Sequence, residues 1–72
     1  MNDPIKLFDV VALLEDLPED NLYRGHVGTV IEVYTPDAFE VEFSDLNGIT
    51  YGMTVLRVDQ LMVLHHAPIH EE

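Results

Sequence analysis

Several segments of this 72-residue chain alternate apolar and polar residues with the two-residue period of a β-strand. The clearest is Phe-Glu-Val-Glu-Phe at 39–43, which places its apolar residues on one face and its glutamates on the other. Residues 26–34 and 49–56 are rich in β-branched and aromatic residues, which favour strands. Shorter apolar runs at 10–14 and 61–64 predict two further strands. The pattern therefore predicts an all-β domain of about five strands.

Turn-forming residues separate these segments. Residues 15–25 include proline, aspartate, asparagine and glycine, which predicts a long loop, with a short helix at 18–20 as an alternative. Tight hairpin turns are expected at 36–38 and at 46–48, the latter with Gly48 in the left-handed conformation. Residues 57–60 are expected to form a single tight turn before the last strand.

A common apolar face suggests how the three central strands pair, because residues opposite each other in an antiparallel pair share a face. This register places Tyr51 and Met53 in the core, and it places Glu32, Glu40 and Glu42 together on the solvent face. The predicted pairs are Thr35 with Phe39, Tyr34 with Glu40, Glu32 with Glu42, Phe43 with Tyr51, and Val41 with Met53.

The predicted order is a strand, a long loop, a three-stranded meander, a tight turn and a short last strand. This is the order of a small SH3-like barrel, partly open, with a long first loop. The Gly25-x-x-Gly28-Thr29-Val30 pattern after the long loop also resembles KOW-type barrels, in which glycines allow a small sheet to bend sharply.

The chain length predicts one domain over residues 1–72, ordered from about 5 to 64, with a flexible polar tail at 65–72. The chain has no cysteine, which excludes disulfides and thiolate zinc sites and fits a reducing compartment. The longest apolar run, Val10–Leu14, is far shorter than the roughly 20 residues that span a bilayer. No secretory signal is visible, so a cytoplasmic location is expected.

The charge balance points to the kind of partner. Fourteen acidic residues face three basic ones, Lys6, Arg24 and Arg57, for a formal net charge of −11. Phosphate backbones and anionic membranes are bound through lysine and arginine, so neither is expected as a direct ligand. A basic protein is the natural complement of this charge. The alternative is that the negative charge only maintains solubility.

The expected interface residues follow from the acidic face. Glu32, Glu40 and Glu42, with Asp37 at the hairpin tip, form a candidate docking surface, although an ordinary solvated face would look the same in the sequence. Tyr23 and Tyr34 are candidates for exposed interface anchors, since tyrosine is favoured at binding hot spots. Packing at the domain edge is the alternative for both tyrosines.

No catalytic, cofactor or metal site is assigned from the sequence. Glu40 and Glu42 could act as an acid–base couple only if burial separated their pKa values, and alternating outward positions offer no burial. His65, His66 and His70 are suitable metal ligands, but a polar tail supplies neither fixed geometry nor supporting hydrogen bonds. No phosphate-binding loop or nucleophile motif is present.

Four short elements together resemble one bacterial family over residues 5–64. They are Asp9-Val10-Val11-Ala12-Leu13, Gly25-His26-Val27-Gly28-Thr29-Val30, Phe39-Glu40-Val41-Glu42-Phe43 and Val58-Asp59-Gln60-Leu61. The family is the domain-of-unknown-function 4926 family. The resemblance implies an SH3-like fold in a small bacterial protein and brings no catalytic residues with it.

Some such families are encoded beside toxins, which suggests an antitoxin or immunity role. The expected function is therefore a non-catalytic protein-binding domain that neutralises a basic toxin or nuclease. The alternative is a structural accessory subunit of a larger bacterial complex, and an enzyme is a distant third.

Overall fold

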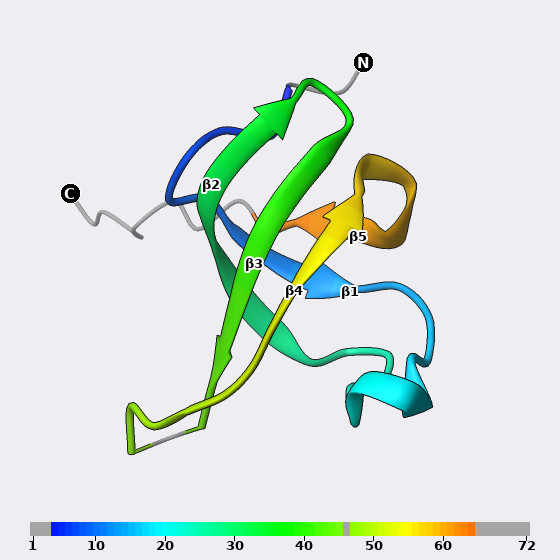
Figure 1. Cartoon of the computed structure of the whole chain (residues 1–72), viewed down its shortest axis with the longest axis vertical. Coiled ribbons are helices and arrows are strands. Elements are labelled where there is room, and N and C mark those ends of the chain that lie inside the picture. The colour runs from blue at the N-terminus through cyan, green and yellow to red at the C-terminus, as the bar shows by residue number, and fades with distance from the viewer. Residues whose placement is uncertain (1–3, 46, 65–72) are drawn as a thin grey trace, which may run out of the picture.

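In the computed structural model, which describes residues 4–45 and 47–64, five strands form one antiparallel sheet in the order β4-β3-β2-β1-β5 (Figure 1). The all-β prediction is confirmed, and the arrangement is compatible with a partly open SH3-like barrel. The predicted tail, 65–72, lies outside the described residues. The strands are β1 (Val10–Leu13), β2 (Val27–Thr35), β3 (Ala38–Ser44), β4 (Thr50–Arg57) and β5 (Leu61–Val63), with 3-10 helices η1 (Pro18–Asp20) and η2 (Val58–Gln60).

The sheet folds its apolar face around a single core. β1 and β5 lie behind β3 and β4 in the view of Figure 1, and buried residues from all five strands form one cluster. β3 contributes the three apolar residues of its alternating pattern, each fully buried. The core consists of Ile5, Val11, Leu13, Leu22, Val30, Phe39, Val41, Phe43, Leu56 and Leu61.

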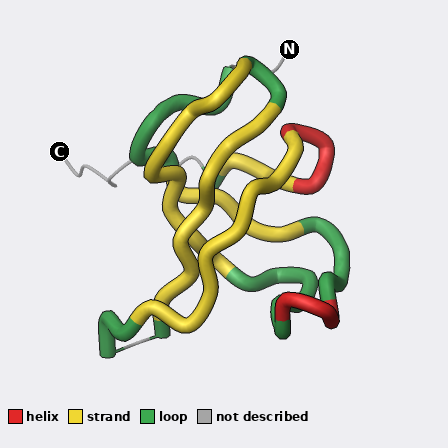
Figure 2. The backbone as a smooth tube through the Cα atoms, in the orientation of Figure 1, coloured by secondary structure: helices red, strands yellow, loops and turns green. Residues whose placement is uncertain are grey.

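The two 3-10 helices lie on the same side of the molecule (Figure 2). η1 interrupts the long loop between β1 and β2, as the alternative prediction allowed, and Leu22 after it is fully buried. η2 forms the tight turn predicted at 57–60. No helix of the described residues is long and apolar enough to cross a membrane.

The predicted register between β2 and β3 is wrong by one residue at Thr35 and by two residues at Glu32. Thr35 pairs with Ala38, which leaves a two-residue turn, and Glu32 pairs with Glu40, where Glu42 was expected. The physical reasons are the turn, which is one residue shorter than predicted, and two irregularities further along β2, between Val33 and Thr35 and between Val30 and Glu32. Each irregularity changes the pairing by one residue. The predicted pairs of Thr35 with Phe39 and of Tyr34 with Glu40 are therefore not formed.

The predicted register between β3 and β4 is wrong by one residue. The turn itself is as expected: Gly48 has a φ of 79°, and Ser44 pairs with Thr50. An irregularity then leaves Tyr51 unpaired, so that Phe43 pairs with Gly52. A one-residue shift moves the following side chains to the opposite face of the sheet.

This shift changes the core composition. Met53 pairs with Glu42, not with Val41, and its side chain is 53% exposed. Tyr51, also predicted in the core, is exposed and packs edge-on against His26, with ring centroids 5.7 Å apart. His26 is half-buried.

The lead-in segment before β1 contributes to the fold through a strained turn. Ile5 is buried in the core, whereas Phe8 is 70% exposed and has a φ of 71°. Positive φ is unfavourable for a bulky side chain. Three hydrogen bonds hold the turn. The Phe8 N–H donates to the Val30 carbonyl, the Asp9 N–H donates to the Lys6 carbonyl, and the Lys6 N–H donates to the Asp9 carboxylate.

Candidate protein interface

The outer face of β2, β3 and β4 carries two rows of side chains that run across the strands. Glu32 of β2 lies opposite Glu40 of β3. In the second row, Glu42 of β3 lies opposite Thr29 of β2. Because Glu40 and Glu42 are two residues apart on one strand, all three glutamates project from the same face. The predicted grouping is therefore correct, although the predicted pairs within it are not.

Neutral hydroxyl groups donate to two of these three carboxylates. The Tyr34 hydroxyl donates to Glu40 Oε1 at 2.9 Å, and the Thr50 hydroxyl donates to Glu42 Oε2. Carboxylates directly opposite each other repel on a sheet surface, and here no lysine or arginine compensates. Among the described residues, the one ion pair joins Arg57 to Asp59. The glutamates thus keep their negative charge available to an external cation.

Tyr34 responds to this acidic environment. The hydrogen bond that it donates to Glu40 raises the pKa of the phenol, as do partial burial and the negative charges of Glu40 and Glu32. Each cause disfavours a phenolate beside carboxylates. The Tyr34 side chain is 55% exposed, so its ring is available to a partner that contacts the acidic residues.

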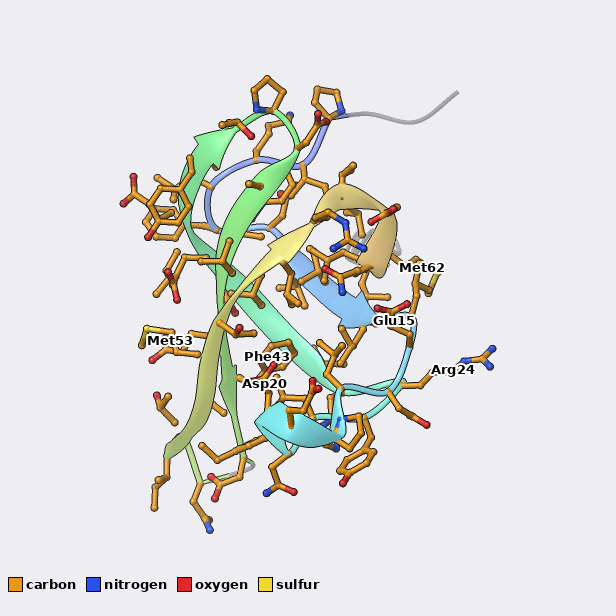
Figure 3. The ribbon with its side chains drawn as sticks, turned by 45° about the vertical axis from the view of Figure 1, so that its right-hand side comes forward. Glu15, Asp20, Arg24, Phe43, Met53 and Met62 are labelled. Carbon is orange, nitrogen blue, oxygen red and sulfur yellow. The ribbon has the colours of Figure 1, made fainter. Side chains whose placement is uncertain are left out.

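Met53 and Val55 of β4 extend the same face with apolar side chains. Met53 lies opposite Glu42, Val55 lies opposite Glu40, and each is 53% exposed. In Figure 3, Met53 points outward from β4, while Phe43 points into the molecule. We define the acidic–apolar face as Glu32, Tyr34, Glu40, Glu42, Met53 and Val55.

The sequence reasoning missed the apolar part of this face, although one signal was available. An isolated glycine within a strand often marks a bulge or a close approach of another segment. Gly52 follows the unpaired Tyr51, and a Cβ atom at Gly52 would lie 3.2 Å from the Leu22 side chain. A bulge placed there would have moved Met53 and Val55 to the outer face.

The two remaining interface candidates lie elsewhere. Asp37 is exposed at the turn between β2 and β3, where its N–H donates to the Thr35 hydroxyl. Tyr23 is half-exposed in the loop before β2 and packs edge-on against His26, with ring centroids 6.0 Å apart. Tyr23 and Tyr51 thus form an aromatic group around His26, and the contacts of Tyr23 are with that group.

The described residues offer little for other chemistry. No group of three or more histidine, cysteine, aspartate or glutamate residues in residues 4–45 and 47–64 has the arrangement of a metal site. The three histidines considered as ligands, His65, His66 and His70, lie outside that part of the chain. The basic residues come from separate places, and Arg24 points away from the body of the molecule (Figure 3).

Comparison with protein families gives one match. The model of the family described as Domain of unknown function (DUF4926) matches residues 7–63. The chain belongs to this family. No match was found among curated proteins or among solved structures.

The family match covers all five strands, so the acidic–apolar face lies within the matched part of the chain. The family description assigns no activity. The physical properties of the face itself therefore carry the functional argument.

Proposed function

We propose that this domain is a non-catalytic protein-binding module that docks a basic partner on its acidic–apolar face. The observation that carries the proposal is the pairing of Glu32 with Glu40 beside Glu42, with hydroxyl donors and no basic side chain among them. These carboxylates repel one another in the free domain, and a cationic surface that covers them relieves this repulsion.

The chemistry of the face supports binding over catalysis. A general acid and a general base need different environments, usually through burial of one carboxylate. Glu40 and Glu42 project from the same face of one strand, and both are half-buried. Neither is placed in a cavity where a substrate would be enclosed.

The form of this function that we favour is an antitoxin or immunity protein that covers the basic site of a toxin, such as a nuclease. Carboxylates on a rigid sheet would occupy positions that phosphates take in the nuclease complex. A structural subunit of a larger assembly is the second candidate, because Met53 and Val55 give the face an apolar part suited to permanent packing.

Affinity capture with three tagged forms of the protein tests the proposal. The forms are the wild type, a face variant (Glu32→Gln, Glu40→Gln and Glu42→Gln), and a control variant (Glu19→Gln, Asp20→Asn and Asp59→Asn). The control positions are exposed and lie outside the face. Both variants lose the same amount of charge at different positions, and the control also removes the exposed ion pair between Arg57 and Asp59.

We expect a basic protein to be captured by the wild type and the control variant, and to be lost from the face variant. Mass spectrometry identifies it, and a titration then shows whether the domain inhibits its activity at a one-to-one ratio. Capture that the face variant retains in full would refute docking on this face. A partner without an activity to inhibit, held in a stable assembly, would favour the structural subunit.

A further inference from the structure

β4 is an edge of the sheet that lacks the usual protection. In the part of the chain that the structure describes, its one strand neighbour is β3, and from Thr50 to Leu56 it has neither a charged residue nor a proline. Sheets generally protect their edges with charges, prolines or short strands, because free N–H and C=O groups can pair with another chain. The opposite edge, β5, has only three residues, whereas β4 has eight.

The hydrogen bond at the end of the β3–β4 ladder shows which backbone groups point away from β3. The Val58 N–H donates to the Asp37 carbonyl at 3.0 Å. These two residues flank the pair of Ala38 with Arg57, so Ala38 and Arg57 form a non-hydrogen-bonded pair. Such pairs alternate with hydrogen-bonded pairs along an antiparallel ladder. The register is regular from there to the bulge at Tyr51. Every second residue of β4 therefore directs its N–H and C=O outward.

These outward groups belong to Met53, Val55 and Arg57. The Arg57 N–H donates to Gln60 Oε1 at 2.8 Å, which occupies that end of the edge. Within the described residues, none of the turn and loop hydrogen bonds reaches the backbone of Met53 or Val55. The backbone groups of these two residues are therefore available to an added strand.

The side chains beside this edge select the chemistry of that strand. An added strand would lie about 5 Å from β4 and about 10 Å from β3. Its outward residues would contact Met53 and Val55 first, and the carboxylates of Glu42 and Glu40 would lie one strand further on. Lysine and arginine suit this spacing, because their apolar stems can cover apolar residues while the charged end reaches beyond them.

We propose that β4 is the docking edge for an extended basic segment of the partner, which joins the sheet as an additional strand. Lysine or arginine at every second position places its stem over Met53 or Val55 and its charge against Glu42 or Glu40. This inference rests on the proposed function, that the partner is basic. A second copy of the chain is disfavoured as the occupant, because each copy has a formal net charge of −11 and would present the same acidic face.

Amide hydrogen exchange on the full chain, followed by NMR, tests the inference. The probe is a synthetic peptide, Thr-Lys-Val-Lys-Val-Lys-Thr, with blocked ends. We expect the bound peptide to slow exchange of the Met53 and Val55 amides at least tenfold. The amides of Gly52 and Thr54 already face β3, so they serve as internal controls and should slow by a smaller factor.

A matched pair of variants tests the edge independently. Val55→Pro removes an outward N–H without removing a hydrogen bond to β3, whereas Val55→Thr keeps that N–H in a strand-favouring residue. We expect Val55→Pro to weaken peptide binding at least tenfold and Val55→Thr to change it less than threefold. Circular dichroism checks that both are folded. If Val55→Pro does not fold, the exchange measurement on the wild type decides.

The remaining outcomes separate this inference from the proposed function. Peptide binding that the face variant weakens, with unchanged Met53 and Val55 amides, would refute strand addition and leave docking on the acidic face intact. Peptide binding that the face variant does not weaken would count against both. Amides that are already protected without peptide would show that the edge is occupied, by a second copy if protection rises with protein concentration and otherwise by this chain itself.

Discussion

Among the glycines of the chain, Gly28 in β2 has the least space for a side chain. A Cβ atom there would lie 2.8 Å from both the Glu42 carbonyl oxygen and Val41 Cγ1, and 2.9 Å from Phe43 Cδ1. These distances are far below van der Waals contact, and the backbone oxygen cannot move without disturbing the β2–β3 ladder. The glycine pattern of the sequence predicted a bend here, but the structure shows that close approach of β3 is the stronger requirement.

We expect Gly28→Ala to lower the free energy of unfolding by about 1–3 kcal/mol, as overpacking of a filled site does. Gly52→Ala is the matched control, because the three atoms nearest to its added methyl group all belong to the Leu22 side chain and none to the backbone, the nearest at 3.2 Å. Urea denaturation of the two variants gives the comparison. A Gly28→Ala variant as stable as the wild type would show that β3 can move away from this position.

Tyr34 offers a test of the field on the acidic–apolar face. Its phenol pKa is raised mainly by the hydrogen bond donated to Glu40, and also by the charges of Glu40 and Glu32. We expect Glu40→Gln to bring this pKa back toward its ordinary value, since the neutral amide accepts a weaker hydrogen bond and carries no charge. Ultraviolet titration measures the change in a background where Tyr23→Phe and Tyr51→Phe leave Tyr34 as the one tyrosine.

The same titration also has a stability consequence. The pKa of Tyr34 is higher in the folded state than in the unfolded state. The protonated phenol therefore contributes to the free energy of unfolding, and this contribution is fully present below the ordinary tyrosine pKa and is lost as pH rises through the folded-state pKa. The Glu40→Gln variant should lose less stability over that alkaline range. Identical titration curves for the two proteins would contradict the hydrogen bond as the main cause.

At the level of elements, the sequence predicted which strands and turns exist better than it predicted their register. Strand existence follows from local composition, and the Gly48 turn follows from local backbone chemistry, so both are readable from short segments. Register depends on bulges near Ile31 and at Tyr51. A bulge is decided by packing between distant segments, such as Leu22 against Gly52. The glutamate face survived both errors because the pairing of Glu32 moved by two residues, which preserves the face, whereas the one-residue shift of β4 exposed Met53.

The turn formed by η2 depends on one buried polar residue, Gln60. Its Oε1 accepts the Arg57 N–H at 2.8 Å, and its Nε2 donates to Glu15 Oε2 at 2.8 Å. The side chain therefore joins the end of β4 to Glu15 in the loop after β1, which lies 45 residues from Gln60 in the sequence. Buried polar groups are costly when one partner is lost.

We expect Gln60→Glu to destabilise the domain by about 1–3 kcal/mol at neutral pH, because it replaces the donor to Glu15 with a second carboxylate. Repulsion and burial raise the folded-state pKa of the introduced acid above its unfolded value. The loss of stability caused by the charged glutamate is therefore present at pH values above its folded-state pKa, and it disappears as pH falls through that pKa. Gln60→Leu removes both hydrogen bonds without adding charge and should show a loss of stability that varies little with pH. Thermal melts from pH 4 to pH 8 distinguish the two.

At the scale of the whole molecule, the net charge can be counted from the sequence, and the structure shows where the charged side chains lie. The formal net charge of −11 identified a basic partner as the expected complement. The sequence could not show that apolar residues of an open edge strand lie beside the glutamates, because that depends on the register of β4.

This distribution of charge predicts opposite effects on stability and on binding. In the face variant, the glutamine side chains still accept the hydrogen bonds from Tyr34 and Thr50, while the repulsion between Glu32 and Glu40 is removed. We expect the free energy of unfolding to stay the same or rise by about 0.2–1 kcal/mol. Association with the identified basic partner should be slower than for the wild type and should depend less on salt, because the steering charge has been lost.

The control variant at Glu19, Asp20 and Asp59 carries the same net charge as the face variant, so it separates local from overall electrostatics. Its association rate should lie near that of the wild type at low and high salt, because the removed charges are away from the docking face. An unfolded face variant would lose stability and binding together, whereas a docking surface loses binding alone. Thermal melts and stopped-flow association rates of the three proteins provide both measurements. Equal association rates for the two variants would mean that overall charge attracts the partner and that the glutamate rows are only solvated surface.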